Sequence, residues 1–224
     1  MTQNNDSLMR TTDEIIGKLE FWMHPTSKGE NMKKHTFEEV EACIAECKYF
    51  WEAQITAGHK PDPAPESSIC EAETILGIKF PKDYRTFLAK WGFLEFTYTY
   101  SHDIYGIRSG NAQASGYPSA IFLTLFGRQY SKLPDKYIAI WSDEGDELWC
   151  VDTSEPDEPI IAWDFFEHTV ARKIADSFID LLYHFAANER RILRDENGKL
   201  LDEENTQYDE VREIVWCCSY IPEN

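Results

Sequence analysis

The sequence predicts a domain that combines α-helices with an antiparallel β-sheet. Three short apolar runs lie close together at Tyr137–Trp141, Leu148–Val151 and Ile160–Trp163. They are rich in Ile, Val, Trp and Tyr, the residue types favoured in strands. Helical apolar patterns precede and follow this region. We therefore expect a three-stranded meander, with helices before and after it in the chain.

Two acidic loops join the strands of this predicted meander. Asp143-Glu144-Gly145-Asp146 has the composition of a hairpin turn, because Gly145 is free to adopt a positive φ. Thr153–Pro159 is a second loop, bounded by proline. The sheet is therefore expected to have apolar strands and carboxylate-rich connections.

The first sixty residues hold two predicted helices. A short one covers Thr12–Met23. A longer one begins at Thr36, which has the capping-box spacing to Glu39; an apolar stripe follows at steps of three and four, and Gly58 ends it. The segment Pro61–Pro65 is a stiff, extended linker, so it is the best candidate for a domain boundary.

Two further helices are predicted directly after the linker. Ser68 and Glu71 have the spacing of a second capping box, and Gly77 ends the helix that they begin. Pro81 opens the next helix at its first turn, and Gly92 closes it.

The segment before the meander contains one clear strand. A period-two pattern over Leu94–Tyr100 predicts a half-buried strand, and Ile104–Ile107 is its candidate partner across a turn at Ser101–Asp103. Ser109–Ser119 is a loop by composition. The short apolar run Ile121–Phe126 fits a helix or a strand equally well.

The chain after the meander is predicted to be mainly helical. Apolar residues at helical spacing predict a helix from about Val170 to Asn188. Asn197-Gly198 marks a two-residue turn, and a last short helix is expected around Tyr208–Val215.

Composition limits the kinds of partner that the chain can bind. The 224 residues carry a formal charge of −18, which disfavours nucleic acid and anionic membranes, because both attract Lys and Arg. A basic protein partner fits this charge, although the acidity could also serve solubility alone. Met1–Asp6 is polar, and no signal peptide or membrane-spanning run is visible. Six irregularly spaced cysteines favour free thiols, so we expect a cytoplasmic protein.

The sequence indicates no catalytic, metal or cofactor site. None of the six histidines has a metalloprotease spacing, and no P-loop, GxSxG or GxGxxG motif occurs. Cys43 and Cys47 are expected to be core thiols, and no CxxC pair is present for zinc. The turn Asp143–Glu147 lacks the order and the closing Glu of an EF-hand. A hydrolase assembled from distant residues stays an open alternative.

Acidic residues are concentrated around the predicted meander. The stretch from Leu133 to His168 contains eleven acidic residues and a single basic one, Lys136. Such clustering costs folding free energy through self-repulsion, and a basic partner would neutralise it. The alternative is that the loop carboxylates are simply well hydrated. The tryptophans of this region, Trp141, Trp149 and Trp163, are either core residues or interface anchors.

Five segments occur in an order and at spacings that are typical of one protein family. The first is Glu73-x-x-Leu76-Gly77-x-x-Phe80-Pro81-x-x-Tyr84-x-x-Phe87-Leu88. The others are Leu133-Pro134 with the strand Tyr137–Ile140, the acidic hairpin, the strand Pro159–Asp164 that ends in Trp-Asp, and Ser177-Phe178 with Leu181-Leu182. From about Ser67 to Glu189 the chain thereby resembles the SUKH superfamily, also called the SMI1/KNR4 family.

The resemblance implies an α+β fold with a central antiparallel sheet flanked by helices. It also divides the chain into an N-terminal helical extension (1–60), a SUKH domain (61–190) and a C-terminal extension (191–224). The sequence departs from the family pattern at Trp91-Gly92, where Asn-Gly is usual, and in the acidity of the turn Asp143–Asp146.

The family is not known for catalysis, so the resemblance implies a binding protein without cofactor, metal or catalytic residue. Many bacterial members resemble immunity proteins that neutralise toxins, often nucleases, whereas fungal relatives act in cell-wall regulation. We therefore expect an immunity protein with a basic toxin as its partner; the alternative is a regulatory scaffold. The expected partner contacts are seven acids of the two loops: Asp143, Glu144, Asp146, Glu147, Glu155, Asp157 and Glu158.

Overall fold

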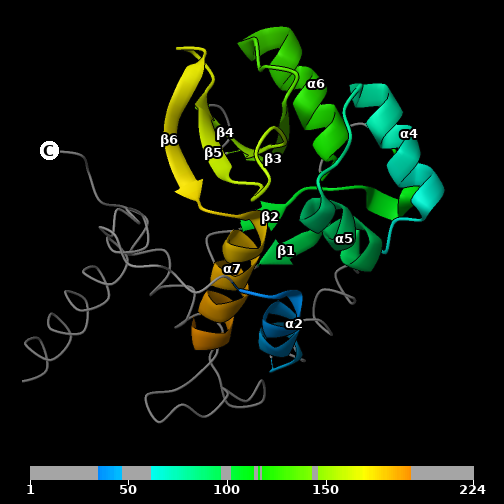
Figure 1. The fold of residues 1–224 in the computed structure, drawn as a ribbon, viewed down its shortest axis with the longest axis vertical. Helices are drawn as coiled ribbons and strands as arrows, with labels where there is room; N and C mark the ends of the chain where they lie inside the picture. The colour runs from blue at the N-terminus through cyan, green and yellow to red at the C-terminus, as the bar shows by residue number, and fades with distance from the viewer. Residues whose placement is uncertain are drawn as a thin grey trace, which may run out of the picture. The chain divides into compact units, whose positions relative to one another are not determined.

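The structure is a computed structural model, and it describes residues 35–46, 62–96, 102–113, 116, 118–142 and 146–192 (Figure 1). The described helices and strands, in chain order, are α2 (Phe37–Glu46), α4 (Glu66–Leu76), α5 (Lys82–Trp91), β1 (Leu94–Phe96), β2 (His102–Ile104), the short 3₁₀ helix η1 (Arg108–Gly110), α6 (Ala120–Ser131), β3 (Tyr137–Ser142), β4 (Glu147–Asp152), β5 (Ile160–Asp164), β6 (Thr169–Ala175) and α7 (Phe178–Ile192). The α+β fold predicted from the sequence is confirmed.

The centre of the domain is an antiparallel sheet in the order β3-β4-β5-β6. Its first three strands are the predicted meander. The fourth strand was missed: we expected a helix from about Val170, but Thr169–Ala175 is β6 and α7 begins only at Phe178. The helix begins there because the Ser177 hydroxyl caps it, accepting a hydrogen bond from the Asp180 backbone N–H at 3.1 Å.

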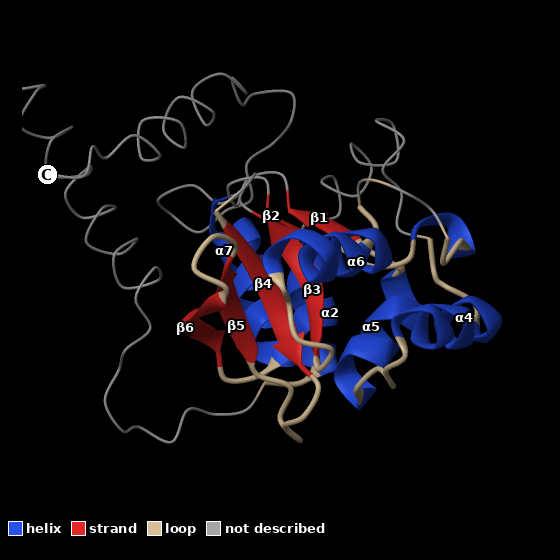
Figure 2. Cartoon of the chain, turned by 90° about the horizontal axis from the view of Figure 1, so that it is seen from above, coloured by secondary structure: helices blue, strands red, loops and turns tan. Residues whose placement is uncertain are grey.

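Both faces of the four-stranded sheet are covered, as Figure 2 shows, with α6 on one side and α7 on the other. Ile138, Ile140 and Val151 share a core cluster with Phe178 of α7. On the opposite face, a second cluster joins Leu123 of α6 to β-strand side chains that include Cys150 and Trp163. Strands buried on both faces read as continuous apolar runs, which explains why these runs do not alternate.

The helix α6 approaches the sheet closely because it carries a glycine at the contact. A Cβ atom at Gly127 would lie 2.7 Å from the Leu148 Cδ1 atom and 3.2 Å from Leu133 Cδ2. The apolar run Ile121–Phe126, which periodicity left ambiguous, is the first part of this helix, which packs on β3 and meets β4 at Leu148.

The short strands β1 and β2 form a separate antiparallel pair. The prediction for this segment was only partly correct: the partner strand is His102–Ile104, which begins two residues before the expected Ile104–Ile107. Residues 97–101, which include the expected end of the first strand, lie outside the described residues. The Tyr105 N–H donates to the Ile140 carbonyl at 2.8 Å and so links this pair to β3.

One of the two predicted capping boxes is present. At the start of α2 the Glu39 N–H donates to the Thr36 hydroxyl at 3.3 Å, and the Thr36 N–H donates to Glu39 Oε2 at 3.0 Å. The box predicted at Ser68 and Glu71 is wrong because α4 already begins at Glu66. Ser68 is buried and its hydroxyl donates to the Gly110 carbonyl instead.

The helix α2 shares the core of the domain that follows it. Val40 and Cys43 are buried in the same cluster as Phe178 and Leu182 of α7. His35, just before α2, donates its backbone N–H to Asp180 Oδ1 at 3.2 Å and stacks its ring on Tyr183. The domain limits near residues 60 and 190 stay predictions, and the helices predicted at Thr12–Met23 and Tyr208–Val215 lie outside the described residues.

Candidate interaction surface

The acidic residues of the meander lie at two opposite ends of the sheet. In an antiparallel meander, alternate connections fall at the same end. The β3–β4 and β5–β6 connections therefore share one end, which we call the hairpin end, and the β4–β5 loop Thr153–Pro159 forms the other, the loop end. At about 3.3 Å per residue, the six residues of β4 separate the two ends by roughly 17 Å.

The hairpin end joins two acidic turns. The Phe165 N–H donates to the Asp146 carbonyl at 2.9 Å, which ties the β5–β6 turn to the β3–β4 connection. Asp146 is exposed, and Glu147 forms an ion pair with Arg172 of β6. Two of the predicted contacts, Asp143 and Glu144, lie outside the described residues.

The β5–β6 turn at this end is built around one carboxylate. Asp164 Oδ1 accepts hydrogen bonds from the backbone N–H groups of Phe166 at 2.9 Å and Glu167 at 2.7 Å. His168, with φ 55°, then turns the chain into β6. Phe166 in this turn is 67% exposed, and the next residue, Glu167, is exposed as well.

At the loop end, Glu155 and Asp157 are exposed, whereas Asp152 is buried and paired. Asp152 Oδ2 accepts a hydrogen bond from Lys136 Nζ at 2.7 Å, and Oδ1 accepts one from the Ser154 N–H at 2.9 Å. Burial alone would raise the pKa of Asp152, but the hydrogen bonds from Lys136 and Ser154 outweigh it and lower that pKa. The one base of the acidic region, Lys136, is thus paired with a carboxylate of the fold itself.

Glu158 does not belong to the surface, which corrects its prediction as a partner contact. Its side chain is only 3% exposed, and its carboxylate accepts hydrogen bonds from the backbone N–H groups of Asp83 at 2.8 Å and Tyr84 at 3.0 Å. These are orphan N–H groups of the first turn of α5, whose N-cap residue Pro81 offers no side-chain acceptor. Glu158 therefore caps α5 from the β4–β5 loop.

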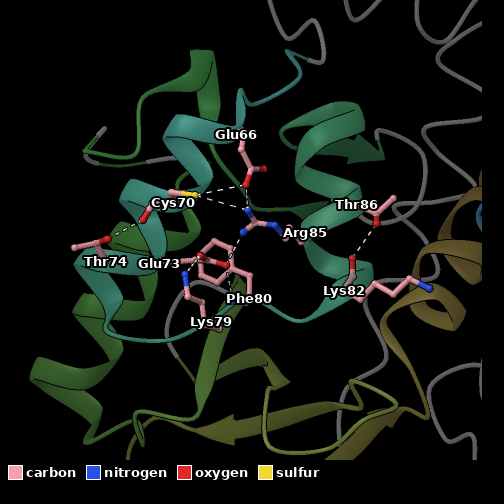
Figure 3. Close-up of polar contacts among 9 residues, drawn as sticks. All are labelled: Glu66, Cys70, Glu73, Thr74, Lys79, Phe80, Lys82, Arg85 and Thr86. Carbon is pink, nitrogen blue, oxygen red and sulfur yellow. Dashed lines mark hydrogen bonds and ion pairs between the residues drawn. The ribbon is translucent and has the colours of Figure 1, made fainter.

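The motif Glu73-x-x-Leu76-Gly77 has a structural role that Figure 3 makes clear. Glu73 is buried; its Oε1 atom accepts from the Phe80 N–H at 3.0 Å and from Arg85 Nη1 at 2.5 Å. Its Oε2 atom pairs with Lys79 Nζ at 2.7 Å. Burial would raise the pKa of Glu73, but these donors together lower it. One carboxylate therefore fixes the α4–α5 connection, next to the αL cap at Gly77.

The three tryptophans of the meander pack within the fold. Trp163 is buried, and its Nε1–H donates to the Ser131 carbonyl at 3.1 Å. The rings of Trp141 and Trp149 have centroids 4.4 Å apart, and both residues are half-buried. None of the three is a prominent surface anchor.

Sequence reasoning missed the exposed aromatic residues. The outer side of α6 and the adjoining β5–β6 turn expose four large rings, those of Phe122, Phe126, Tyr130 and Phe166. The signal was present in the run Ala120–Phe126, which is apolar on almost every side of a helix. A helix with that pattern is normally covered on all sides.

The described residues hold no group of three or more His, Cys, Asp or Glu side chains that could bind a metal ion. Cys70 and Cys150 are free thiols, and Cys43 is buried in the core as predicted. Cys47 lies outside the described residues. No helix within the described ranges is long and apolar enough to cross a membrane.

Comparison with known proteins identifies the family. The SUKH_6 family model, described as SMI1-KNR4 cell-wall, matches residues 66–182, slightly more than half of the chain. No curated protein matches the chain. The match begins with α4, spans the sheet and ends within α7, so it covers the segments on which the resemblance was recognised. The chain therefore belongs to the SUKH superfamily, in its SMI1/KNR4 family.

Proposed function

We propose that this chain is a non-enzymatic immunity protein of the cytoplasm that binds and neutralises a basic bacterial toxin, of the nuclease type. The observation that carries the proposal is the excess of carboxylates at the hairpin end, on a domain whose family suggests protein–protein interaction. A nuclease must present a basic surface to its substrate. An acidic protein is suited to cover that surface.

The hairpin end is the proposed contact region for the toxin. Asp143, Glu144 and Asp146 belong to the β3–β4 connection, and Asp164 and Glu167 belong to the neighbouring turn. Glu147 adds a further carboxylate, although Arg172 pairs with it. Charges gathered at one end steer the encounter with an oppositely charged partner and raise the association rate.

Charge reversal at each end of the sheet tests this proposal. Asp143→Lys/Asp146→Lys reverses two charges at the hairpin end, and Glu155→Lys/Asp157→Lys is the matched control at the loop end. Candidate toxins are co-expressed with each variant, and cell growth reports neutralisation. With the purified toxin, we expect the first variant to associate about tenfold more slowly at low salt, and the control to behave like the wild type.

Three outcomes would count against the proposal in different ways. Slow association of the loop-end variant alone would move the contact to Glu155 and Asp157. Equal association of both variants and wild type would remove charge steering. A chain that rescues growth from no toxin, and that binds cellular proteins indifferently to salt, would favour the regulatory scaffold.

A further inference from the structure

A ridge of aromatic side chains runs along the outer side of α6 and onto the β5–β6 turn. Ring centroids are 6.3 Å apart for Phe122 and Phe126, 4.8 Å for Phe126 and Tyr130, and 5.7 Å for Phe126 and Phe165. Phe166 follows, with its ring 5.7 Å from that of Phe165. We call these five residues the aromatic ridge.

The ridge is exposed although it is built like a core. Phe122, Tyr130 and Phe166 are 43%, 56% and 67% exposed, and Leu125 of the same helix is exposed as well. Scattered apolar residues on a surface need no explanation, but a contiguous exposed patch marks an interaction site. Aromatic anchors of this kind contribute most to binding when a partner removes them from water.

The ridge is held rigidly, so it is ready to bind. The Ser131 hydroxyl at the end of α6 donates to the Phe165 carbonyl at 2.9 Å and also accepts from Trp163 Nε1 at 2.9 Å. Asp164 fixes the turn that carries Phe166. These bonds lock α6 to the end of β5, and a preorganised surface loses less entropy on binding.

The ridge adjoins the hairpin end, and the negative charge of that end indicates which kind of partner the ridge binds. The Phe165 N–H binds the Asp146 carbonyl, and the exposed Glu167 follows Phe166 in the same turn. The exposed Lys132, just after α6, adds one positive charge, which these carboxylates outnumber. A second copy of this chain would place like charges against each other. The C-terminal residues 193–224 would do the same, because they contain nine acidic and only three basic residues.

We propose that the aromatic ridge is the docking surface for a basic protein segment with apolar anchors, whose Lys or Arg side chains meet the acids of the hairpin end. This inference rests on the proposed function for the source of the partner, the toxin. It adds that apolar anchoring on α6, rather than charge alone, holds the complex together.

The test uses the full chain and a dye-labelled amphipathic helical peptide made of Leu and Lys. Two matched peptides replace Lys by Glu or Leu by Ser, and fluorescence anisotropy measures binding. We expect the wild type to bind the Leu/Lys peptide. We expect it to bind each of the two matched peptides more weakly than the Leu/Lys peptide. Tyr130→Ser/Phe166→Ser should weaken the binding of the Leu/Lys peptide about tenfold. The control Tyr130→Phe/Phe166→Tyr keeps the rings and should bind like the wild type; circular dichroism verifies the fold of each variant.

Several results would overturn this inference. Equal binding by wild type and Tyr130→Ser/Phe166→Ser would do so, as would failure of the wild type to bind the Leu/Lys peptide. A dimer in light scattering that Tyr130→Ser/Phe166→Ser dissociates would assign the ridge to self-association. Protection of Tyr130 and Phe166 from hydroxyl-radical oxidation in the free monomer would assign it to another part of the same chain.

The peptide test is independent of the proposed function. If no toxin is neutralised but the ridge variant loses peptide binding, the docking surface is supported and the proposed toxin neutralisation is not. If growth is rescued and the ridge variant binds the peptide like the wild type, toxin neutralisation is supported and the docking surface is not.

Discussion

A single buried carboxylate, that of Glu73, fixes the connection between α4 and α5. It serves the Phe80 backbone N–H, Arg85 and Lys79 together. Glu73→Gln keeps the size of the side chain but removes its charge, so we expect a loss of about 1.5–3 kcal/mol in the free energy of unfolding. Because the pKa of Glu73 is lowered in the fold, its stabilisation is present at neutral pH and disappears as the pH falls below about 4.5.

Urea unfolding of wild type and Glu73→Gln at several pH values measures this effect. Lys79→Gln is the matched control: Lys79 is 85% exposed and binds the same carboxylate, so its removal should change stability little. Equal losses for the two variants would mean that the ion pair with Lys79 carries the effect, and that the charge of Glu73 adds little to its bonds with Arg85 and the Phe80 N–H.

Glu158 shows the opposite pH dependence. Burial raises the pKa of this carboxyl, although the Asp83 and Tyr84 N–H groups oppose the shift. A raised pKa means that its stabilisation is complete below the ordinary value of 4.5 and is lost as the pH rises through the folded-state pKa. The stability of Glu158→Gln relative to the wild type should therefore improve as the pH rises from about 4 towards neutral.

The comparison uses Glu158→Ala as its second variant. Removing both acceptors from the start of α5 should cost about 1–2 kcal/mol at about pH 4, the usual effect of losing a helix cap. This cost relative to the wild type should shrink as the pH rises, because the wild-type carboxyl loses its own stabilisation over the same range. Thermal unfolding of the three proteins across this pH range gives the differences directly. A Glu158→Gln variant that loses stability as the pH rises would mean that the helix N-terminus favours the charged form more than burial opposes it.

At the scale of whole elements, α2 depends on α7 for its stability. Val40 is fully buried in the cluster that contains Phe178 and Leu182. Val40→Ala should therefore destabilise the domain by about 1–3 kcal/mol, and unfolding should stay a single transition. Circular dichroism and tryptophan fluorescence, followed together in urea, would measure both properties. Val170→Ala, at a residue 41% exposed on β6, is the control and should have a much smaller effect.

Separate transitions for the two probes in Val40→Ala would show that α2 unfolds on its own. In that case the segment before the linker would behave as an extension that merely rests on the domain. A single shifted transition would instead make α2 part of the cooperative unit.

The elements that the sequence predicted well are those with a strong local signal. The strands β3, β4 and β5 follow from three apolar runs, and the helices α4 and α5 follow from their stripes and from Gly77 and Gly92. β6 was missed because Thr169–Ala175 is largely exposed, so it shows no buried alternation, and its end runs into the helical stripe of α7. The capping pair Ser177 and Asp180 was the signal that separated the two.

At the scale of the whole molecule, the site was harder to predict than the fold. Acids that are close in the sequence lie at opposite ends of the sheet, because each strand carries the chain from one end to the other. Glu158 faces the interior because α5, some seventy residues earlier in the chain, needs an acceptor there. The aromatic ridge brings Phe126 of α6 beside Phe165 of the turn, and only the packing of the helix on the sheet determines that contact.

The outer strand β6 determines how a partner can approach the sheet. Its pairing with β5 is interrupted at two places, and it exposes Arg172 and Lys173. Irregular pairing and exposed charge are the means by which natural sheets prevent a further strand from joining their edge. A protein that recognises this domain would thus gain little from main-chain hydrogen bonding along β6, the mode called strand addition. Recognition would instead rest on side chains, so specificity can change by surface substitution while the sheet itself stays the same.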